Sequence, residues 1–442
     1  MKVLKFGGTS VGTPERMKMI ADLIRQDPGR KIIVLSALAG TTNDLEKICK
    51  LCYAHEFAEA KQIVEKLEIH YHQFTGHLFS PDCTPDGIGE NQIQFFNEIK
   101  NKLADPFTSR TEKWILSRGE LWSTRIFHLY LESAGIGSVL LPALNFMRID
   151  KTNEPDEYFI KSMLIKEMEI LGDQNIYITQ GYICRNAFGE VDNLHRGGSD
   201  FTATLIGAAL GADEIQIWTD IDGIHNNDPR EVDKTFPIRQ LSYEEAAELA
   251  YFGAKILHPS CVRPAQKAGI PIWLKNTMDP TSSGTLISHS GEKKDITAIA
   301  AKDGITAIKI KSGRMMMAYG FLKRVFEVFE KYETPIDMIT TSEVAVSLTI
   351  DNPKQLNKIT GELRNFGQVE IDKDQTIICI VGNFISERSG YANKIFSSLS
   401  HVPIRMISYG GSKHNVSILV STKSKQKALQ ALNAGLFDLE AS

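Results

Sequence analysis

The run Arg196-Gly197-Gly198-Ser199-Asp200 places an arginine, two glycines, a hydroxyl and a carboxylate in five consecutive positions. It leads into a stretch over 200–210 that is predicted to be a helix. Glycines let the backbone approach a ligand closely, and the start of a helix offers free N–H groups and the positive end of its dipole. An arginine adds a fork that fits a carboxylate or a phosphate. The run therefore favours an anion site over the alternative of a polar loop that only caps a helix.

A second run, Lys5-Phe6-Gly7-Gly8-Thr9-Ser10, joins a lysine near a strand end to two glycines and two hydroxyls. Such a loop can present backbone N–H groups and one positive charge to a phosphate. Phosphoryl transfer needs mainly positioning and charge neutralisation from a protein. The chain has no Walker loop, no G-x-G-x-x-G after a strand and no protein-kinase motif set. Taken alone, this run fits a turn with a helix cap equally well.

Strands and helices alternate along the first two thirds of the chain. The strands are continuous apolar runs, which is typical of a sheet covered on both faces. Strands are predicted at 2–6, 31–35, 137–141, 176–180, 214–219 and 271–275. Helices are predicted from a Thr13 cap with Pro14 at the first position, over most of 44–104 with a break at 81–89, and over 112–133, 200–210 and 242–252.

The remaining third repeats itself after a polar stretch, 282–295, which we expect to be a linker. Ile308-Lys309-Ile310 is echoed by Ile378-Cys379-Ile380, and 335–339 is echoed by 403–407. Each copy reads strand, helix, strand, strand, helix, which suits a ferredoxin-like unit. Two small paired modules are therefore expected.

Composition excludes several classes of protein. The chain has 442 residues, enough for two or three domains, and 50 basic against 54 acidic side chains without a basic cluster. We therefore expect no nucleic-acid partner, and no membrane association because no apolar run is long enough. The first residues lack the apolar segment of a signal peptide, so a cytoplasmic location is expected. Cys49 and Cys52 form a C-x-x-C without a second pair, which favours apolar helix residues over a zinc or redox site.

Five motifs, in order along the chain, resemble those of the aspartate kinases (aspartokinases), and the repeated tail resembles the tandem ACT domains of that family. The motifs are Lys5–Ser10, Arg118-Gly119-Glu120, Arg196–Asp200, Thr219–Gly223 with Asp228-Pro229-Arg230, and Gly253-Ala254-Lys255 with Leu257-His258-Pro259. The resemblance implies an α/β amino-acid-kinase fold, a three-layer αβα sandwich with a mostly parallel sheet, over 1–295. It further implies a first ACT domain at 312–382, nested in a second made of 296–311 and 383–442.

The implied reaction transfers the γ-phosphoryl group of ATP to the β-carboxylate of L-aspartate, with Mg²⁺ between the phosphates. It is the first step toward lysine, threonine and methionine. By resemblance, Lys5, Gly8 and Asp200 serve catalysis, and Thr42, Glu120, Arg196 and Ser199 hold aspartate. Considered alone, Glu120 reads as an exposed helix residue. The residues implied for the nucleotide are Lys5, Gly7, Gly8, Thr9, Ser10, Thr219, Asp220, His225, Asp228, Arg230 and Lys255. His225 stands where the family often has tyrosine, which puts the adenine contact in question.

The tail resembles the effector site of lysine-sensitive aspartate kinases. The implied effector residues are Met315, Ala318, Phe321, Leu322, Asp337, Ser342 and Glu343. Lysine is the expected inhibitor, with threonine as the alternative, and the chain is expected to form a homodimer or a dimer of dimers. Core and dimer packing would also explain these residues. Two other functions stay open: a related kinase with another acceptor, and a non-catalytic amino-acid sensor.

Overall fold

The computed structural model describes residues 1–81, 84–194, 197–253, 257–291, 295–313, 319–383 and 389–437. The chain divides into two compact units. The first comprises Met1–Ile224, Arg239–Tyr243 and Ile256–Ser290, and the second comprises His225–Ile238, Glu244–Lys255 and Gly291–Ser442. The predicted boundary at residue 295 differs from this division. The side chains of Asn226 and Asn227 donate to Asn433, and Thr297 donates to Glu245, so two earlier segments fold with the C-terminal unit.

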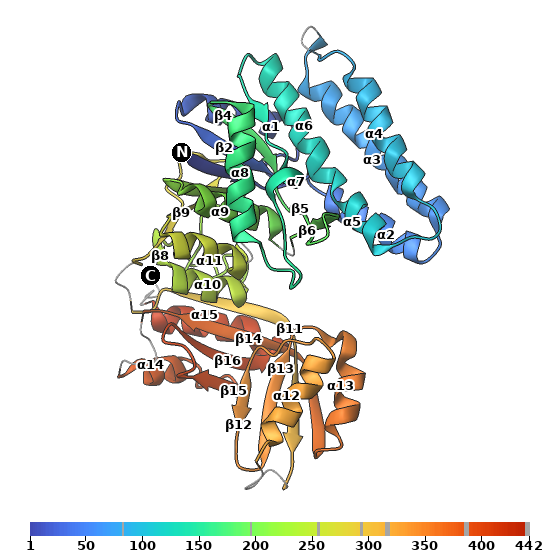
Figure 1. The fold of residues 1–442 in the computed structure, drawn as a ribbon. Helices are drawn as coiled ribbons and strands as arrows, with labels where there is room; N and C mark the ends of the chain where they lie inside the picture. Colours follow the sequence, from blue (N-terminus) through green and yellow to red (C-terminus); the bar gives the residue numbers. More distant parts are fainter. Residues whose placement is uncertain are drawn as a thin grey trace. The chain divides into compact units, whose positions relative to one another are not determined.

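An eight-stranded sheet forms the middle of the first unit (Figure 1). Its order is β3 (Val139–Leu140), β4 (Ile176–Gln180), β2 (Lys31–Leu35), β1 (Lys2–Phe6), β7 (Glu214–Thr219), β9 (Ile272–Asn276), β10 (Thr285–Ser288) and β8 (Gln240–Ser242). All neighbours are parallel except β9 and β10. A separate two-stranded sheet joins β5 (Ile183–Arg185) to β6 (Val191–Asn193).

Helices cover both faces of this sheet, as its apolar strands require. One layer contains α8 (Glu157–Leu171), α9 (Gly198–Leu210) and α11 (Pro259–Ala268), next to the short α7 (Ala143–Phe146). The other contains α1 (Pro14–Gln26) and α6 (Arg118–Ser133), with α2 (Thr41–Tyr53), α3 (Phe57–Leu78), α4 (Ile88–Lys102) and α5 (Ser109–Leu116) packed farther out. Thr13 caps α1 by accepting from the Arg16 amide, as predicted. Cys49 and Cys52 are buried in α2, and burial raises the pKa of Cys49 to about 12.

Two expectations about elements are corrected. The predicted linker at 282–295 contains β10, whose Thr285 and Ile287 are fully buried and which pairs with both β9 and β8. The predicted single helix over 112–133 is two helices, because the helix is interrupted at Ser117 between α5 and α6.

The second unit contains one antiparallel six-stranded sheet that runs through both tail modules. Its order is β12 (Ile339–Thr341), β13 (Ala345–Ile350), β11 (Ala298–Lys311), β14 (Gln368–Val381), β16 (Asn415–Ser421) and β15 (Ile404–Tyr409). Its helices are α10 (Tyr243–Tyr251, which begins in the first unit), α12 (Phe321–Lys331), α13 (Leu356–Leu363), α14 (Tyr391–Ser398) and α15 (Lys425–Leu436), with short 3₁₀ turns η2 (Pro353–Gln355) and η3 (Thr422–Ser424).

The two long central strands pair along their whole length, from Ala298 opposite Val381 to Lys311 opposite Gln368. The register shifts after Lys302, where Gly304 adopts a φ of 77° that favours glycine. One apolar core lies under each half: Ile308, Phe321 and Leu363 belong to one core, and Ile299, Ile378 and Leu432 to the other. Each half of the strand pair therefore serves one module. Within the described ranges, no helix has the length and hydropathy needed to cross a bilayer.

Candidate active site

A buried ion pair lies where the central strands of the first unit end. Lys5 is on β1, with Val34 of β2 on one side and Ile217 of β7 on the other. Its Nζ lies 2.6 Å from Oδ1 of Asp200, and both side chains are about one tenth exposed (11% and 12%). In parallel sheets, ligands bind outside the carboxyl ends of the strands. The pair thus holds a cation at the place where the fold binds ligands.

The first turn of α9 supplies Asp200 and closes tightly on its neighbours. Its N-cap, Gly197, has a φ of 78° and makes no side-chain cap, so the helix start presents backbone N–H groups. A Cβ built on Gly181 would lie 2.5 Å from Oγ of Ser199, so this turn tolerates only glycine beside it. Arg196, predicted to bind the substrate, lies outside the described residues.

The glycine loop after β1 packs against the loop after β2. The Gly7 amide donates to the Trp218 carbonyl at 3.2 Å, and a Cβ on Gly8 would lie 3.0 Å from the Ala37 carbonyl oxygen. Thr9 is exposed at the surface of this loop. The Ser10 hydroxyl is buried and lies 2.8 Å from the hydroxyl of Thr277, so the structure engages it in packing.

Glu120 is buried, contrary to the exposed position that its helix pattern alone indicates. It lies in the first turn of α6 and is 3% exposed. Its Oε1 accepts from the Ala37 amide at 3.3 Å, and its Oε2 has no hydrogen-bond partner among the described residues. Burial raises the pKa of this carboxyl to about 8.

Thr42 is half-buried in the first turn of α2, after Gly40 with a φ of 83°.

Arg118, which precedes Glu120 in its motif, has a packing role. Its guanidinium carbon lies 3.5 Å from the ring centroid of Trp114 and its Nη1 lies 3.7 Å from Glu98. Burial lowers its pKa to about 10. The stacked geometry fixes the start of α6, and with it the position of Glu120.

The residues predicted to bind the nucleotide fall in both units. In the first unit, Thr219 is the last residue of β7 and Asp220 follows it, and the Thr219 hydroxyl donates to the Asp220 carboxylate at 3.1 Å. His225, Asp228 and Arg230 belong to the second unit. Nδ1 of His225 lies 3.1 Å from the Thr235 hydroxyl.

Arg230 and Asp228 form a two-point ion pair, at 2.9 and 2.7 Å, which holds the pKa of Asp228 below its usual range. Lys255 lies outside the described residues. No group of three or more His, Cys, Asp or Glu suited to a metal ion occurs in the described part of the chain.

The predicted effector residues have mixed environments. Phe321 is 4% exposed and belongs to the apolar core of its module, whereas Leu322 and Glu343 are exposed. The Ser342 amide donates to the Ala345 carbonyl at 2.8 Å. Met315 and Ala318 lie outside the described residues. A pocket of about 520 Å³ is lined by Lys309, Lys311, Ser312, Gly313, Thr340, Thr341, Ser342, Val344, Ala345 and Ser347.

Asp337 is engaged by two side chains that sequence reasoning did not single out. Its Oδ1 lies 2.7 Å from Nζ of Lys302 and accepts from the Tyr251 hydroxyl at 3.0 Å, while Lys302 also pairs with Asp351 at 2.8 Å. Burial raises the pKa of Asp337 despite the Lys302 cation. No local pattern marks Lys302 or Tyr251, because both meet Asp337 only through the fold.

The first unit with its mostly parallel sheet defines a member of the amino acid kinase family, whose model matches residues 1–276, and an ACT domain model matches 378–436. Within that class, the chain belongs to the aspartokinases. It is 35% identical over 460 residues to chloroplastic aspartokinase 1 of Arabidopsis thaliana, covering 99% of this chain and 80% of that protein. It is 32% identical over 451 residues to lysine-sensitive aspartokinase 3 of Escherichia coli, covering 99% of both.

Two solved structures of E. coli aspartokinase III resemble this chain over its whole length. The complex with aspartate and ADP in the R-state has a TM-score of 0.88 at 31% identity, covering 99% of this chain and 100% of that one. The complex with lysine and aspartate in the T-state has a TM-score of 0.82 at 31% identity, covering 99% of each. The similarity therefore extends through the catalytic and the ACT regions alike.

Proposed function

We propose that this chain transfers the γ-phosphoryl group of ATP to the β-carboxylate of L-aspartate, giving 4-phospho-L-aspartate and ADP. Membership of the aspartokinases and the Lys5–Asp200 pair at 2.6 Å carry the proposal. The reaction starts the biosynthesis of lysine, threonine and methionine. The related E. coli enzyme crystallised with aspartate and ADP supports both substrates.

Each side chain has a defined part in this reaction. Lys5 neutralises charge on the transferring phosphoryl group, and Asp200 fixes the ammonium in place. Asp200 is not needed as a base, since the attacking carboxylate is already ionised. Thr42, Ser199 and Arg196 hold the aspartate carboxylates, and Glu120 receives its α-ammonium group. The loop of Gly7, Gly8, Thr9 and Ser10 is proposed to bind the phosphates, with Thr9 exposed; the Gly7 amide and the buried Ser10 hydroxyl would first have to leave their partners Trp218 and Thr277. The proposed contacts of the rest of the nucleotide are Thr219, Asp220, His225, Asp228, Arg230 and Lys255.

Mg²⁺ fits this site without a protein cage. It binds one or two carboxylates together with phosphate oxygens, so the nucleotide supplies most of its ligands. Asp200, paired with Lys5 of β1, and Asp220, directly after β7, are two carboxylates next to strand ends of the first unit. When bound, the ion screens the negative charge of the phosphates.

The tail acts as a regulator of this activity. We assign it two ACT modules, the first nested in the second, and a homodimer or dimer of dimers as the working assembly. Lysine is the proposed inhibitor, because E. coli aspartokinase III was crystallised with lysine and the relative is lysine-sensitive. Ser342 and Glu343 near the 520 Å³ pocket are its proposed contacts.

A coupled assay tests the reaction. The purified chain should form ADP only when aspartate, ATP and Mg²⁺ are all present, and Lys5→Ala or Asp200→Ala should lower kcat by a factor on the order of 10²–10³. Arg25→Ala, which removes an exposed arginine on α1, is the control and should leave kcat unchanged.

An acceptor panel separates the alternatives. Turnover with glutamate, acetylglutamate or UMP but not with aspartate would contradict the proposed acceptor. Binding of an amino acid by the ACT modules with no turnover of any acceptor would instead identify a sensor.

A further inference from the structure

The residues 225–238, here called the nucleotide segment because they contain His225, Asp228 and Arg230, form a closed loop within the second unit. His225 bridges to Pro237. The Asn226 amide donates to the Phe236 carbonyl at 3.0 Å, and the Phe236 amide returns a bond to Oδ1 of Asn226 at 2.8 Å. The segment therefore has a defined conformation of its own.

Asn433 on α15 holds both the beginning and the later part of this loop. Its Oδ1 accepts from the side-chain amides of Asn226 at 3.0 Å and Asn227 at 3.4 Å, and its Nδ2 donates to the Lys234 carbonyl at 2.8 Å. Asn226, Asn227 and Asn433 are each at most 3% exposed. Buried amides that lose their partners are costly, so these contacts hold the loop to the helix.

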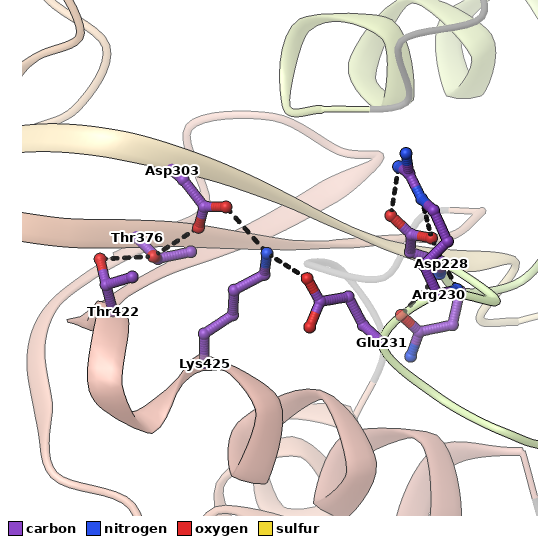
Figure 2. A network of polar contacts seen from close by, with 8 residues as sticks. Asp228, Arg230, Glu231, Asp303, Thr376, Thr422 and Lys425 are labelled. Atoms are coloured by element: carbon purple, nitrogen blue, oxygen red, sulfur yellow. Dashed lines mark hydrogen bonds and ion pairs between the residues drawn. The ribbon is translucent and has the colours of Figure 1, made fainter.

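Lys425, at the start of α15, fastens the loop a second time (Figure 2). Its Nζ lies 2.7 Å from Oε1 of Glu231 and 2.8 Å from Oδ2 of Asp303 on β11. The Thr376 hydroxyl donates to the other oxygen of Asp303 at 2.8 Å, which fixes that carboxylate. Burial by itself lowers the pKa of Lys425, but its hydrogen bonds to Asp303 and Glu231 outweigh burial and raise the pKa.

The pair Asp228–Arg230 lies between these two attachments. The Asp228 carbonyl accepts from the amides of Glu231 and Val232 at 3.0 Å, so the turn is compact. Val232 is buried in the apolar core that contains Ile378 and Leu432. Every flank of the Asp228–Arg230 turn is thus attached to the second ACT module, and Figure 2 shows the Asp228–Arg230 pair close to this network.

We propose that Asn433 and Lys425 are positioning residues, which hold the nucleotide segment in the conformation that binds ATP. The proposal rests on the proposed function, in which this segment contacts the nucleotide. It makes nucleotide affinity depend on a helix of the regulatory tail, through residues that act by way of the segment.

Substitution of Lys425 tests the proposal, because it should change the constants for the nucleotide and leave the KM for aspartate nearly unchanged. Lys425→Met should raise the KM for ATP and the Kd for ADP about three- to tenfold, as expected for the loss of a partly buried charge-assisted hydrogen bond. The KM for aspartate should change less than twofold, and Lys425→Arg should restore most of the loss. Lys427→Met, at an exposed position on the same helix, is the matched control and should have no effect.

A double-mutant cycle shows whether the effect passes through the segment. In a Glu231→Ala background, Lys425→Met should add little to the KM for ATP, because the contact between Lys425 and residue 231 is already lost. Asn433→Ala should act in the same direction as Lys425→Met, with Asn433→Asp milder because it keeps the acceptor oxygen. Equal effects on both substrates, or an unchanged Kd for ADP in a Lys425→Met protein of normal Tm, would overturn the proposal.

A direct measurement of ADP binding tests the positioning role independently of which acceptor the chain phosphorylates. Calorimetry with ADP alone measures the nucleotide site without any phosphoryl transfer. A wild-type chain that binds ADP but does not phosphorylate aspartate would contradict the proposed function, and the variants would still decide the positioning role.

Discussion

Lys5 and Asp200 come from distant parts of the sequence, and their 2.6 Å contact offsets part of the cost of burying either charge. A lysine held this way reaches the reaction with its ammonium already oriented. Little reorganisation is then needed when charge develops on the phosphoryl oxygens.

The Glu120 carboxyl should make aspartate binding depend on pH. Its pKa of about 8 means that it is mostly protonated at pH 7, and only the ionised form attracts the substrate ammonium. We therefore expect kcat/KM for aspartate to rise as the pH increases from 6.5 to 8.5, by roughly 25-fold, and then to level off. Glu120→Gln should lower kcat/KM and flatten this rise. Rate measurements across this range, with saturating ATP, check the prediction.

Stability provides a readout for Glu120 that needs no substrate. Because its pKa is raised from 4.5 to about 8 in the folded chain, the folded state keeps a proton that the unfolded state releases. Glu120 therefore lowers the free energy of unfolding progressively as the pH rises from about 4.5 to about 8. Glu120→Gln should raise Tm at pH 8 more than at pH 5. An equal shift at both pH values would contradict a buried, proton-binding carboxyl.

At the scale of elements, the strand ends and the helix starts form the site together. β1, β2, β4 and β7 end at one edge, and Gly181, directly after β4, lies against the first turn of α9. A Cβ at Gly181 would meet Cβ and Oγ of Ser199 at 2.5 Å and the Cα of Ser199 at 2.8 Å. Since the backbone of α9 cannot move without moving Asp200, the substitution should displace the ion pair.

Gly181→Ala should therefore lower kcat/KM for aspartate by about tenfold or more, since small displacements of catalytic groups cost large factors. Gly76→Ala, in α3, where nothing lies within 4 Å of the added Cβ, is the control and should leave the rate unchanged and the fold slightly more stable. Steady-state kinetics and Tm measure both. Full activity of Gly181→Ala would show that the first turn of α9 does not position the site.

The local sequence pattern predicted the strands near the site, but it did not predict which distant elements contact one another. The continuous apolar runs at 2–6, 31–35, 176–180 and 214–219 predicted strands whose bounds the structure confirms. β10 was missed because four residues in a polar stretch carry little periodic signal, and its partners are supplied by distant strands.

Burial of Glu120 was missed for a related reason. Its helix pattern is amphipathic in the ordinary way, and its burial depends on contacts from distant segments, such as that of the Ala37 amide. The expected proximity of Lys5 and Asp200 came from the family resemblance, since their spacing in the sequence does not indicate a contact. Lys425 and Asn433 carried no signal, because a lysine and an asparagine on a polar helix face usually serve solvation.

At the scale of the molecule, regulation should pass through the first ACT module. Lysine is expected to inhibit, and Ser342→Ala and Glu343→Ala should each raise the lysine concentration for half inhibition about tenfold, the loss of one ammonium contact. The uninhibited kcat should stay within twofold. Titration of each variant with lysine, and in parallel with threonine, measures this.

Glu330→Ala is the control for this titration, since it removes an exposed glutamate on α12 of the same module. Its inhibition curve should match that of the unaltered chain. If Glu343→Ala and Glu330→Ala behave alike, the effector site lies elsewhere.

The strands β11 and β14 have a consequence for how the tail could be dissected or exchanged. One half of each strand belongs to one module and the other half to the other module. β11 stays paired with β14 from Ala298 to Lys311. Excision of 312–382 would leave β11 without its antiparallel mate and open both apolar cores. The two modules are thus inseparable by any single cut, and a chimaera with another regulator has to inherit the whole six-stranded sheet.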